Sequence, residues 1–254
     1  MELQVMKRAL VRPPGDSYPK CISSHTDCYS VDLKLARQQH AEYCRILTEL
    51  GLDVIELEAD HLHPDACFVE DTAVIHRNRA FITRMACESR RGEEAVVLRL
   101  LSEHMRTREA TFPATIEGGD VIHLSDRLVT GITQRTNLVG VDQMVEWLQV
   151  DSKLVTDYSI VHLKSHATYI ADGLFIVSSI FANHPVFLDS EKVVVPLDEQ
   201  YATNTLTIDD IVLMPAGHLR SISMVKEHGF EVIPVNMSEF EKCEGALTCL
   251  SLIF

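Results

Sequence analysis

A hairpin pattern that recurs four times is the feature that most constrains the fold of this chain. Each copy consists of two apolar runs joined by a few turn residues, and successive copies start about 37 to 48 residues apart. A repeat at this period is typical of architectures built from similar units. The paired runs are 73–75 with 81–82, 121–124 with 128–129, 169–170 with 175–177, and 206–208 with 212–214.

The two ends of the chain supply a fifth unit. Apolar residues alternate with others from Leu250 to Phe254, which predicts a strand that Cys249 opens. The best partner for that strand is the apolar run 3–11, which Pro13 stops. Pairing the first strand with the last would close the five units into a ring, whose inner hairpin ends would converge on the axis.

Helical patterns fall between the strands. They cover 33–50, before Gly51, and 93–104, 137–148 and about 219–229, with further strands at 54–57 and 232–235. We therefore predict an α/β fold, a five-bladed pseudo-symmetric α/β-propeller that forms a single closed domain over residues 1–254. An ordinary mixed α/β sandwich with coincidental hairpin spacing is the alternative.

Composition narrows the class of protein and of ligand. The chain has 254 residues, 46% of them hydrophobic, which is enough for a large core. No apolar run approaches the roughly 20 residues of a membrane helix, and the start lacks a signal-peptide layout. We expect a soluble cytoplasmic protein, with a homodimer left open. The net charge of −14 disfavours nucleic acid and anionic membranes and weakly favours a small cationic ligand.

Seven cysteines are an odd number, and they lack Cys-x-x-Cys pairs. A complete disulfide framework is thereby excluded, and we expect reduced thiols, most of them small core residues. His61, His63 and Asp65 alternate in a way that could bind a metal, but Pro64 interrupts them and a loop is the better interpretation.

Acidic motifs stand at equivalent places before the first two hairpins. Glu70 and Asp71 precede the first hairpin, and Glu117 and Asp120 precede the second. Such residues usually form turns or caps. Because two repeats carry them at corresponding positions, beside an axial thiol, they indicate a shared site.

His162 and two arginines complete the candidate site. His162 precedes the third hairpin and is the best partner for Cys249, although a histidine between apolar neighbours is more often a core residue. Arg90 and Arg135 follow the outgoing strands of hairpins one and two. A helix amino terminus prefers acidic side chains, so arginines there suggest an anion such as a ligand carboxylate.

These groups fit chemistry on a guanidinium ion. Carboxylates can orient the cation while the Cys249 sulfur attacks its carbon. The His162 imidazolium would lower the pKa of the thiol, protonate the departing amine, and then activate water to cleave the thiouronium adduct.

An ordered set of motifs along nearly the whole chain resembles that of the dimethylarginine dimethylaminohydrolases, in the guanidine-modifying superfamily of five-bladed α/β-propellers (penteins). The resemblance implies hydrolysis of Nω-methylated arginines to citrulline and a methylamine. The motifs are 68–71 (FVED), 89–92 (SRRG), 117–120 (EGGD), 135–137 (RTN), 162–164 (HLK), 201–204 (YATN) and 247–249 (LTC).

The resemblance also implies roles for single residues. Cys249 would be the nucleophile and His162 the general acid and base, and Glu117 would support the histidine or a guanidinium nitrogen. Glu70 and Asp71 would contact the guanidinium, Arg90 and Arg135 the substrate carboxylate, and Asp65 the α-amino group. No metal or cofactor is implied, although zinc could bind to the thiolate and histidine as an inhibitor.

Two stretches depart from the family pattern. The loop 13–30, which should cover the substrate, has no glycine hinge between Cys21 and Ser30, and 84–88 lacks the expected Pro-Gly. Three alternatives follow: hydrolysis of another guanidino or ureido compound such as arginine, a noncatalytic guanidinium-binding propeller, or a thiol and histidine metal-binding protein.

Overall fold

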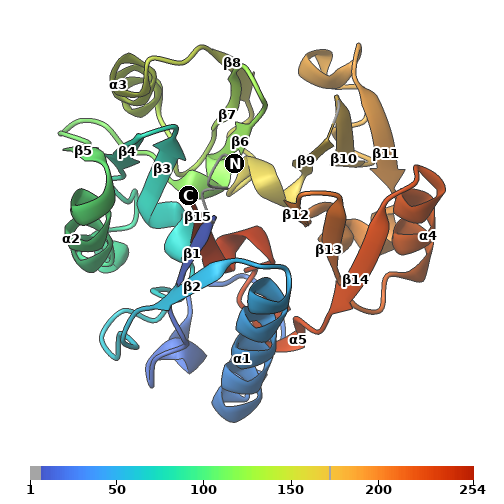
Figure 1. Ribbon diagram of the computed structural model, residues 1–254, viewed down its shortest axis with the longest axis horizontal. Coiled ribbons are helices and arrows are strands. Elements are labelled where there is room, and N and C mark those ends of the chain that lie inside the picture. Colours follow the sequence, from blue (N-terminus) through green and yellow to red (C-terminus); the bar gives the residue numbers. More distant parts are fainter. Residues whose placement is uncertain (1–6, 172) are drawn as a thin grey trace, which may run out of the picture.

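Five three-stranded sheets stand around a common centre (Figure 1). The computed structural model describes residues 7–171 and 173–254. Every sheet has the same construction, with an antiparallel pair toward the centre and a parallel pair toward the rim. The sheets are β15-β1-β2 (Ser251–Ile253, Arg8–Val11, Asp53–Glu56), β3-β4-β5 (Ala73–His76, Arg79–Ile82, Arg106–Glu109), β6-β7-β8 (Val121–His123, Leu128–Ile132, Ser152–Thr156), β9-β10-β11 (Ala167–Ala171, Leu174–Ser178, Glu191–Val195) and β12-β13-β14 (Leu206–Ile208, Ile211–Pro215, Glu231–Val235).

Helices carry the chain from the second to the third strand of four sheets, as a parallel pair requires. They are α1 (Leu33–Glu49), α2 (Glu94–His104), α3 (Leu138–Leu148) and α4 (Leu219–Glu227), and a short α5 (Ser238–Glu241) follows the last sheet. Asn137 caps α3, because its side chain accepts a hydrogen bond from the Gly140 amide. Within 7–171 and 173–254, no helix combines the length and the apolar character needed to cross a membrane.

The ring closes where the two ends of the chain meet. β1 pairs antiparallel with β15, with Leu10 opposite Leu252, and β1 is almost fully buried between its neighbours. The predicted pairing of first and last strands is therefore confirmed for 8–11, whereas residues 3–6 of the predicted strand lie outside the described residues. The five-bladed α/β-propeller prediction is confirmed as well.

A short 3₁₀ turn precedes the inner strand of every sheet. Successive turns contact one another around the centre of the ring. One prediction is corrected here: Cys249 lies within the last turn, and the strand begins only at Ser251. The turns are η3 (Val69–Thr72), η5 (Gly118–Asp120), η6 (Leu163–Ser165), η8 (Leu197–Thr203) and η9 (Thr248–Leu250).

Candidate active site

Cys249 and His162 open onto one cavity of about 970 Å³. Three predicted ligand-binding groups, Asp65, Asp71 and Arg135, line the same cavity, and so does the edge of Arg90. These residues are up to 184 positions apart in the chain (Asp65 to Cys249), yet the central turns bring them together. The structure thus provides the shared hollow that thiol and imidazole chemistry on one substrate requires.

His162 is held by carboxylates on two turns. Its Nε2 lies 2.8 Å from an oxygen of Glu117 and 3.8 Å from an oxygen of Asp71. Burial disfavours the charged ring, but the Asp71 charge and the hydrogen bond to Glu117 outweigh it and raise the pKa of His162 to about 9. The ring is therefore an imidazolium at neutral pH, the form that donates a proton.

Two residues of the Glu-Gly-Gly-Asp motif place that ring. A Cβ added to Gly119 would stand 2.9 Å from the His162 ring and 2.9 Å from an oxygen of Asp71, so only glycine fits. Asp120 accepts a hydrogen bond from the Leu163 amide at 2.8 Å and fixes the turn that carries His162. The motif thus supplies both the partner and the space that His162 needs.

The Cys249 thiol is protonated in the unliganded site. Burial, followed by the charges of Glu70 and Asp71, raises the pKa of Cys249 to about 12. The expectation that the imidazolium lowers the pKa of this thiol is therefore wrong for the unliganded protein. The loss of water and two nearby carboxylates outweigh the hydrogen bond from the Ala246 backbone and the charge of Lys164, which lower the pKa. A thiolate requires a further positive charge in the cavity.

Asn204 fixes the turn that carries the thiol. Its side-chain oxygen accepts from the Thr248 amide, and its amide nitrogen donates to the Thr248 hydroxyl, both at 3.0 Å. Asn204 belongs to the motif 201–204, but the sequence alone assigned it no role. Its position directly before the fourth hairpin, equivalent to the acidic motifs, was the signal that could have revealed it.

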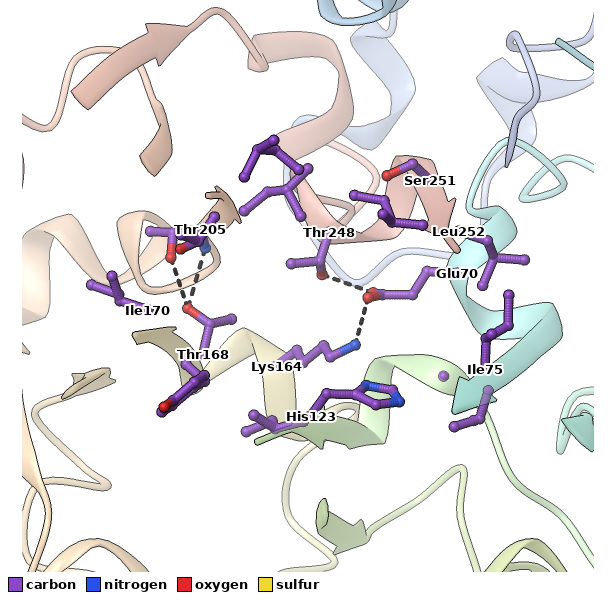
Figure 2. A pocket seen from close by; sticks show the side chains of 18 of the residues that line it. Glu70, Ile75, His123, Lys164, Thr168, Ile170, Thr205, Thr248, Ser251 and Leu252 are labelled. Atoms are coloured by element: carbon purple, nitrogen blue, oxygen red, sulfur yellow. Dashed lines mark hydrogen bonds and ion pairs between the residues drawn. The ribbon is translucent and has the colours of Figure 1, made fainter. Parts of the chain in front are cut away.

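Glu70 lies on a different cavity from Cys249 and His162. A cavity of about 490 Å³ on the inner strands is lined by Glu70, Lys164 and Thr248. Figure 2 shows Lys164 and Thr248 both directed at the Glu70 carboxylate, with contacts of 2.5 Å and 2.7 Å. The structure therefore does not bring Glu70 to the cavity that holds the thiol, and its contact with a guanidinium stays a prediction.

Arg90 is enclosed by carboxylates. Its guanidinium donates to both oxygens of Glu93 and, at 2.9 Å, to Asp71, and it lies 3.6 Å from Glu117. The Arg90 side chain is only 5% exposed. The charges of Arg90 and His162 overcome the effect of burial and lower the pKa of Asp71 to about 2. Arg90 thus keeps Asp71 ionised, and its predicted contact with a substrate carboxylate is untested.

Arg135 is the more accessible of the two arginines. One of its nitrogens donates to the Cys87 sulfur, and the guanidinium lies 3.8 Å from Glu117. Cys87 belongs to the stretch 84–88 in which the sequence departs from the family pattern. Because cysteine sulfur is a weak acceptor, the remaining Arg135 donors can turn to an anion in the cavity.

The loop 13–30 covers the cavity and reaches Asp65. Both oxygens of Asp65 accept from the Ile22 amide, at 3.2 and 3.3 Å, and burial raises the pKa of Asp65 to about 6. Ser24 donates to Glu244 on the opposite wall. The loop thus closes over the cavity through backbone and side-chain contacts, which supports the predicted lid.

A disulfide joins Cys21 of this loop to Cys243. The expectation that the cysteines are reduced thiols is therefore wrong for these two. The odd count excluded only a framework that uses every cysteine, and the two partners are 222 residues apart in the chain. The ring closure brings them together, with their Cα atoms 5.8 Å apart, within the range for a disulfide.

His61 and His63, for which the sequence favours a loop over a metal site, are paired with separate carboxylates. His61 lies 3.0 Å from Asp16, and His63 lies 2.7 Å from Asp60. These contacts fit the loop interpretation. At the wall of the cavity, Asp71, His162 and the buried Glu117 place ligand atoms within 4.8 Å of one another, but Arg90 already donates to Asp71.

Comparison with known proteins agrees with this geometry. An arginine deiminase family model matches residues 60–179. A dimethylarginine dimethylaminohydrolase from Pseudomonas aeruginosa is 33% identical over 98% of this chain and 100% of its own length. The chain belongs to the dimethylarginine dimethylaminohydrolase family. The Streptomyces coelicolor dimethylarginine dimethylaminohydrolase is also 33% identical, over 97% of this chain and 96% of its own length.

Solved structures of the family superpose closely. The C249S variant of the Pseudomonas aeruginosa dimethylarginine dimethylaminohydrolase, in complex with citrulline, has a TM-score of 0.94 and 30% identity, covering 98% of this chain and 100% of the other. The N-terminal domain of a cyanobacterial arginine dihydrolase has a TM-score of 0.88 at 19% identity, covering 97% of each chain, and shows the shared fold.

Proposed function

We propose that this protein hydrolyses Nω-methylated arginines, such as asymmetric dimethylarginine and monomethylarginine, to citrulline and a methylamine. The observation that carries the proposal is the meeting of Cys249, His162 and Asp71 in one cavity. Membership of the dimethylarginine dimethylaminohydrolase family and the relative that holds citrulline support the same activity. The five blades together act as one catalytic domain over residues 1–254, with no metal or cofactor in the reaction.

Binding of the substrate prepares the nucleophile. The planar guanidinium enters beside Asp71, whose low pKa keeps it ionised. The positive charge of the substrate then offsets the carboxylate charges that raise the pKa of Cys249. The thiol releases its proton to water once the cation is in place, so the thiolate forms where it is needed.

The first half of the reaction replaces a C–N bond by a C–S bond. The Cys249 sulfur attacks the guanidinium carbon and forms a tetrahedral intermediate. His162 gives a proton to the dimethylated nitrogen, the C–N bond breaks, and dimethylamine leaves. A covalent thiouronium adduct on Cys249 and a neutral His162 remain.

The second half restores the enzyme. Neutral His162 takes a proton from water, and the oxygen of that water attacks the thiouronium carbon. The C–S bond breaks, the hydroxyl proton passes to the departing Cys249 sulfur, and the carbon becomes the ureido carbonyl of citrulline. Glu117 stabilises the imidazolium that forms again.

Groups at the far wall hold the amino-acid end of the substrate. We assign the α-amino group to Asp65 and the carboxylate to Arg135, which can leave its contact with Cys87. Arg90 joins this contact only by releasing a bond to Asp71 or Glu93. Glu70, by accepting from Thr248, holds the turn of Cys249, and a direct contact with the guanidinium would require release of Lys164.

A substrate panel tests the proposal. Purified protein should form citrulline from monomethylarginine and asymmetric dimethylarginine, and Cys249→Ser should lose turnover but keep binding by calorimetry. Cys28→Ser, at a free cysteine outside the cavity, is the matched control and should retain activity. Citrulline formation by Cys249→Ser would remove the proposed nucleophile, and binding without turnover by the wild type would favour a noncatalytic binding protein.

Arginine is the second candidate substrate, favoured by the arginine deiminase family model that matches 60–179. The same panel decides, because turnover of arginine above that of the methylated forms would support this activity. Because agmatine lacks the carboxylate, Arg135 should not contribute to its binding. The predicted homodimer and cytoplasmic location belong to this proposal too, and sedimentation tests the dimer.

A further inference from the structure

Three side chains that commonly bind transition metals meet outside the active-site cavity, on the first blade. They are His40 and Cys44 of α1 and Glu56 of β2. Their ligand atoms all lie within 4.8 Å of one another. No step of the proposed reaction uses any of them.

The local fold explains why they meet. His40 and Cys44 are four residues apart on one helix, so their side chains lie one above the other on the same face. The chain then turns at Gly51, whose φ of 87° suits glycine, and returns along β2 to Glu56. α1 packs against β2, which brings the last residue of the strand to the helix.

The spacing of nitrogen and sulfur fits a tetrahedral zinc ion. The His40 Nδ1 and the Cys44 Sγ are 3.6 Å apart. A zinc ion with bonds of about 2.0–2.1 Å to nitrogen and about 2.3 Å to sulfur, at a tetrahedral angle, separates those two atoms by about 3.6 Å. The distance between these two ligand atoms therefore already matches that of a tetrahedral zinc site, and the helix does not have to move.

The imidazole ring of the buried His40 also lacks good hydrogen bonds. The residue is 1% exposed, and its Nε2 has no hydrogen-bond partner in the described ranges 7–171 and 173–254. The one polar contact of the ring is the weak one to the Cys44 sulfur. A metal ion on Nδ1 would replace this weak contact by a strong bond, while the surroundings of Nε2 would not change.

We propose that His40 Nδ1, Cys44 Sγ and a Glu56 carboxylate oxygen bind a divalent transition-metal ion, with Zn²⁺ as the best fit. A set of one nitrogen, one sulfur and one oxygen suits zinc, whereas magnesium and calcium take oxygen ligands. The thiol releases its proton on binding. Because Glu56 is exposed, water completes the fourth position.

The role of this metal is to link α1 to β2. A ligand that binds only the folded state stabilises that state, and these three residues come together only when helix and strand are packed. The site is separate from the cavity of Cys249, which His40, Cys44 and Glu56 do not line. The metal therefore affects stability and not the chemistry proposed above.

Binding of Co²⁺ and Zn²⁺ to the Cys249→Ser protein tests the inference, because that background removes the active-site thiol. The metal-stripped, disulfide-intact protein should bind one equivalent of Co²⁺ under anaerobic conditions, with a thiolate charge-transfer band. Adding Cys44→Ser should abolish the band, and adding Cys28→Ser should leave it. Absence of a band, or a band that persists without Cys44, overturns the proposal.

A second pair of variants keeps the test independent of folding. Glu56→Gln, at an exposed position, should weaken Zn²⁺ affinity at least about tenfold in competition with a chromophoric chelator. Glu58→Gln, at another exposed position two residues on, should not change the affinity. Zn²⁺ should raise the Tm of the Cys249→Ser protein and of its Glu58→Gln derivative. Equal affinities of the two glutamine variants would contradict a role for Glu56.

Discussion

Replacing Glu117 by glutamine removes a negative charge next to His162 while keeping the shape of the side chain. His162 has its pKa raised from 6.5 to about 9, which corresponds to roughly 3 kcal/mol in favour of the imidazolium. Glu117 contributes a 2.8 Å hydrogen bond and a charge, whereas Asp71 acts from 3.8 Å. The pKa of His162 should therefore fall by at least about one pH unit in Glu117→Gln, or about 1.4 kcal/mol.

The direction of the pH effect follows from the role of the ring. His162 must be protonated to donate to the departing amine, so kcat/KM should decline as pH rises through the pKa of the free enzyme. That decline should lie near pH 9 in the wild type and near pH 8 or below in Glu117→Gln. The imidazolium form, and any stability it adds, is fully present below 6.5 and lost as pH rises through about 9.

Two measurements check this reasoning. The pH profile of kcat/KM for monomethylarginine gives the position of the decline, and a nuclear magnetic resonance titration of His162 in the Cys249→Ser protein gives the pKa directly. Glu191→Gln is a matched control at an exposed glutamate and should change neither. An unchanged pKa of His162 in Glu117→Gln would refute the assignment of Glu117 as its main partner.

Three further changes have defined outcomes. Gly119→Ala should lower kcat at least about tenfold, because its Cβ displaces the His162 ring, while thermal unfolding shows a folded protein. Lys164→Met should lower the free energy of unfolding in urea by about 3 kcal/mol, since it leaves Glu70 buried and unpaired, and adding Glu70→Gln should recover part of that loss. Cys21→Ser should lower the unfolding free energy by about 2–5 kcal/mol and raise KM more than it changes kcat, because the lid that meets Asp65 loses its tether. An unchanged stability of Lys164→Met or Cys21→Ser, or full activity of Gly119→Ala, would contradict the corresponding contact.

The fold could be predicted from the sequence because its signals are local and repeated. Each hairpin is a pair of apolar runs around a short turn. The start of the helix at 138–148 is marked by Asn137, a residue type that often caps helices. Closure of the ring followed from the alternating apolar residues at the end of the chain. The same reasoning placed the strand one turn too early, because a 3₁₀ turn around Cys249 has no periodicity of its own.

The sequence placed Glu70 with the other site residues, whereas the structure puts it on a second cavity, and the contacts that enclose Arg90 and set the thiol pKa were not foreseen. Asp71, Glu117, His162 and Cys249 converge because equivalent turns of the blades converge. The pKa of the thiol depends on burial and on two carboxylates, which no spacing reveals.

The enclosure of Arg90 and the Cys21 to Cys243 disulfide depend on three-dimensional contacts as well. Glu93 is three residues from Arg90, a spacing typical of helical turns, yet only the structure shows both side chains buried together. Cys21 and Cys243 meet only because the loop 13–30 folds back over the cavity.

Trapping the covalent intermediate tests the central claim most directly. Wild-type protein mixed with excess monomethylarginine and quenched in acid within one turnover should carry a thiouronium adduct, and peptide mass spectrometry should place it on Cys249. The His162→Gly protein, which lacks the base for the second half, should accumulate the adduct from a substrate analogue with a good leaving group. An adduct on another residue, or citrulline released by a Cys249→Ser protein, would contradict the account.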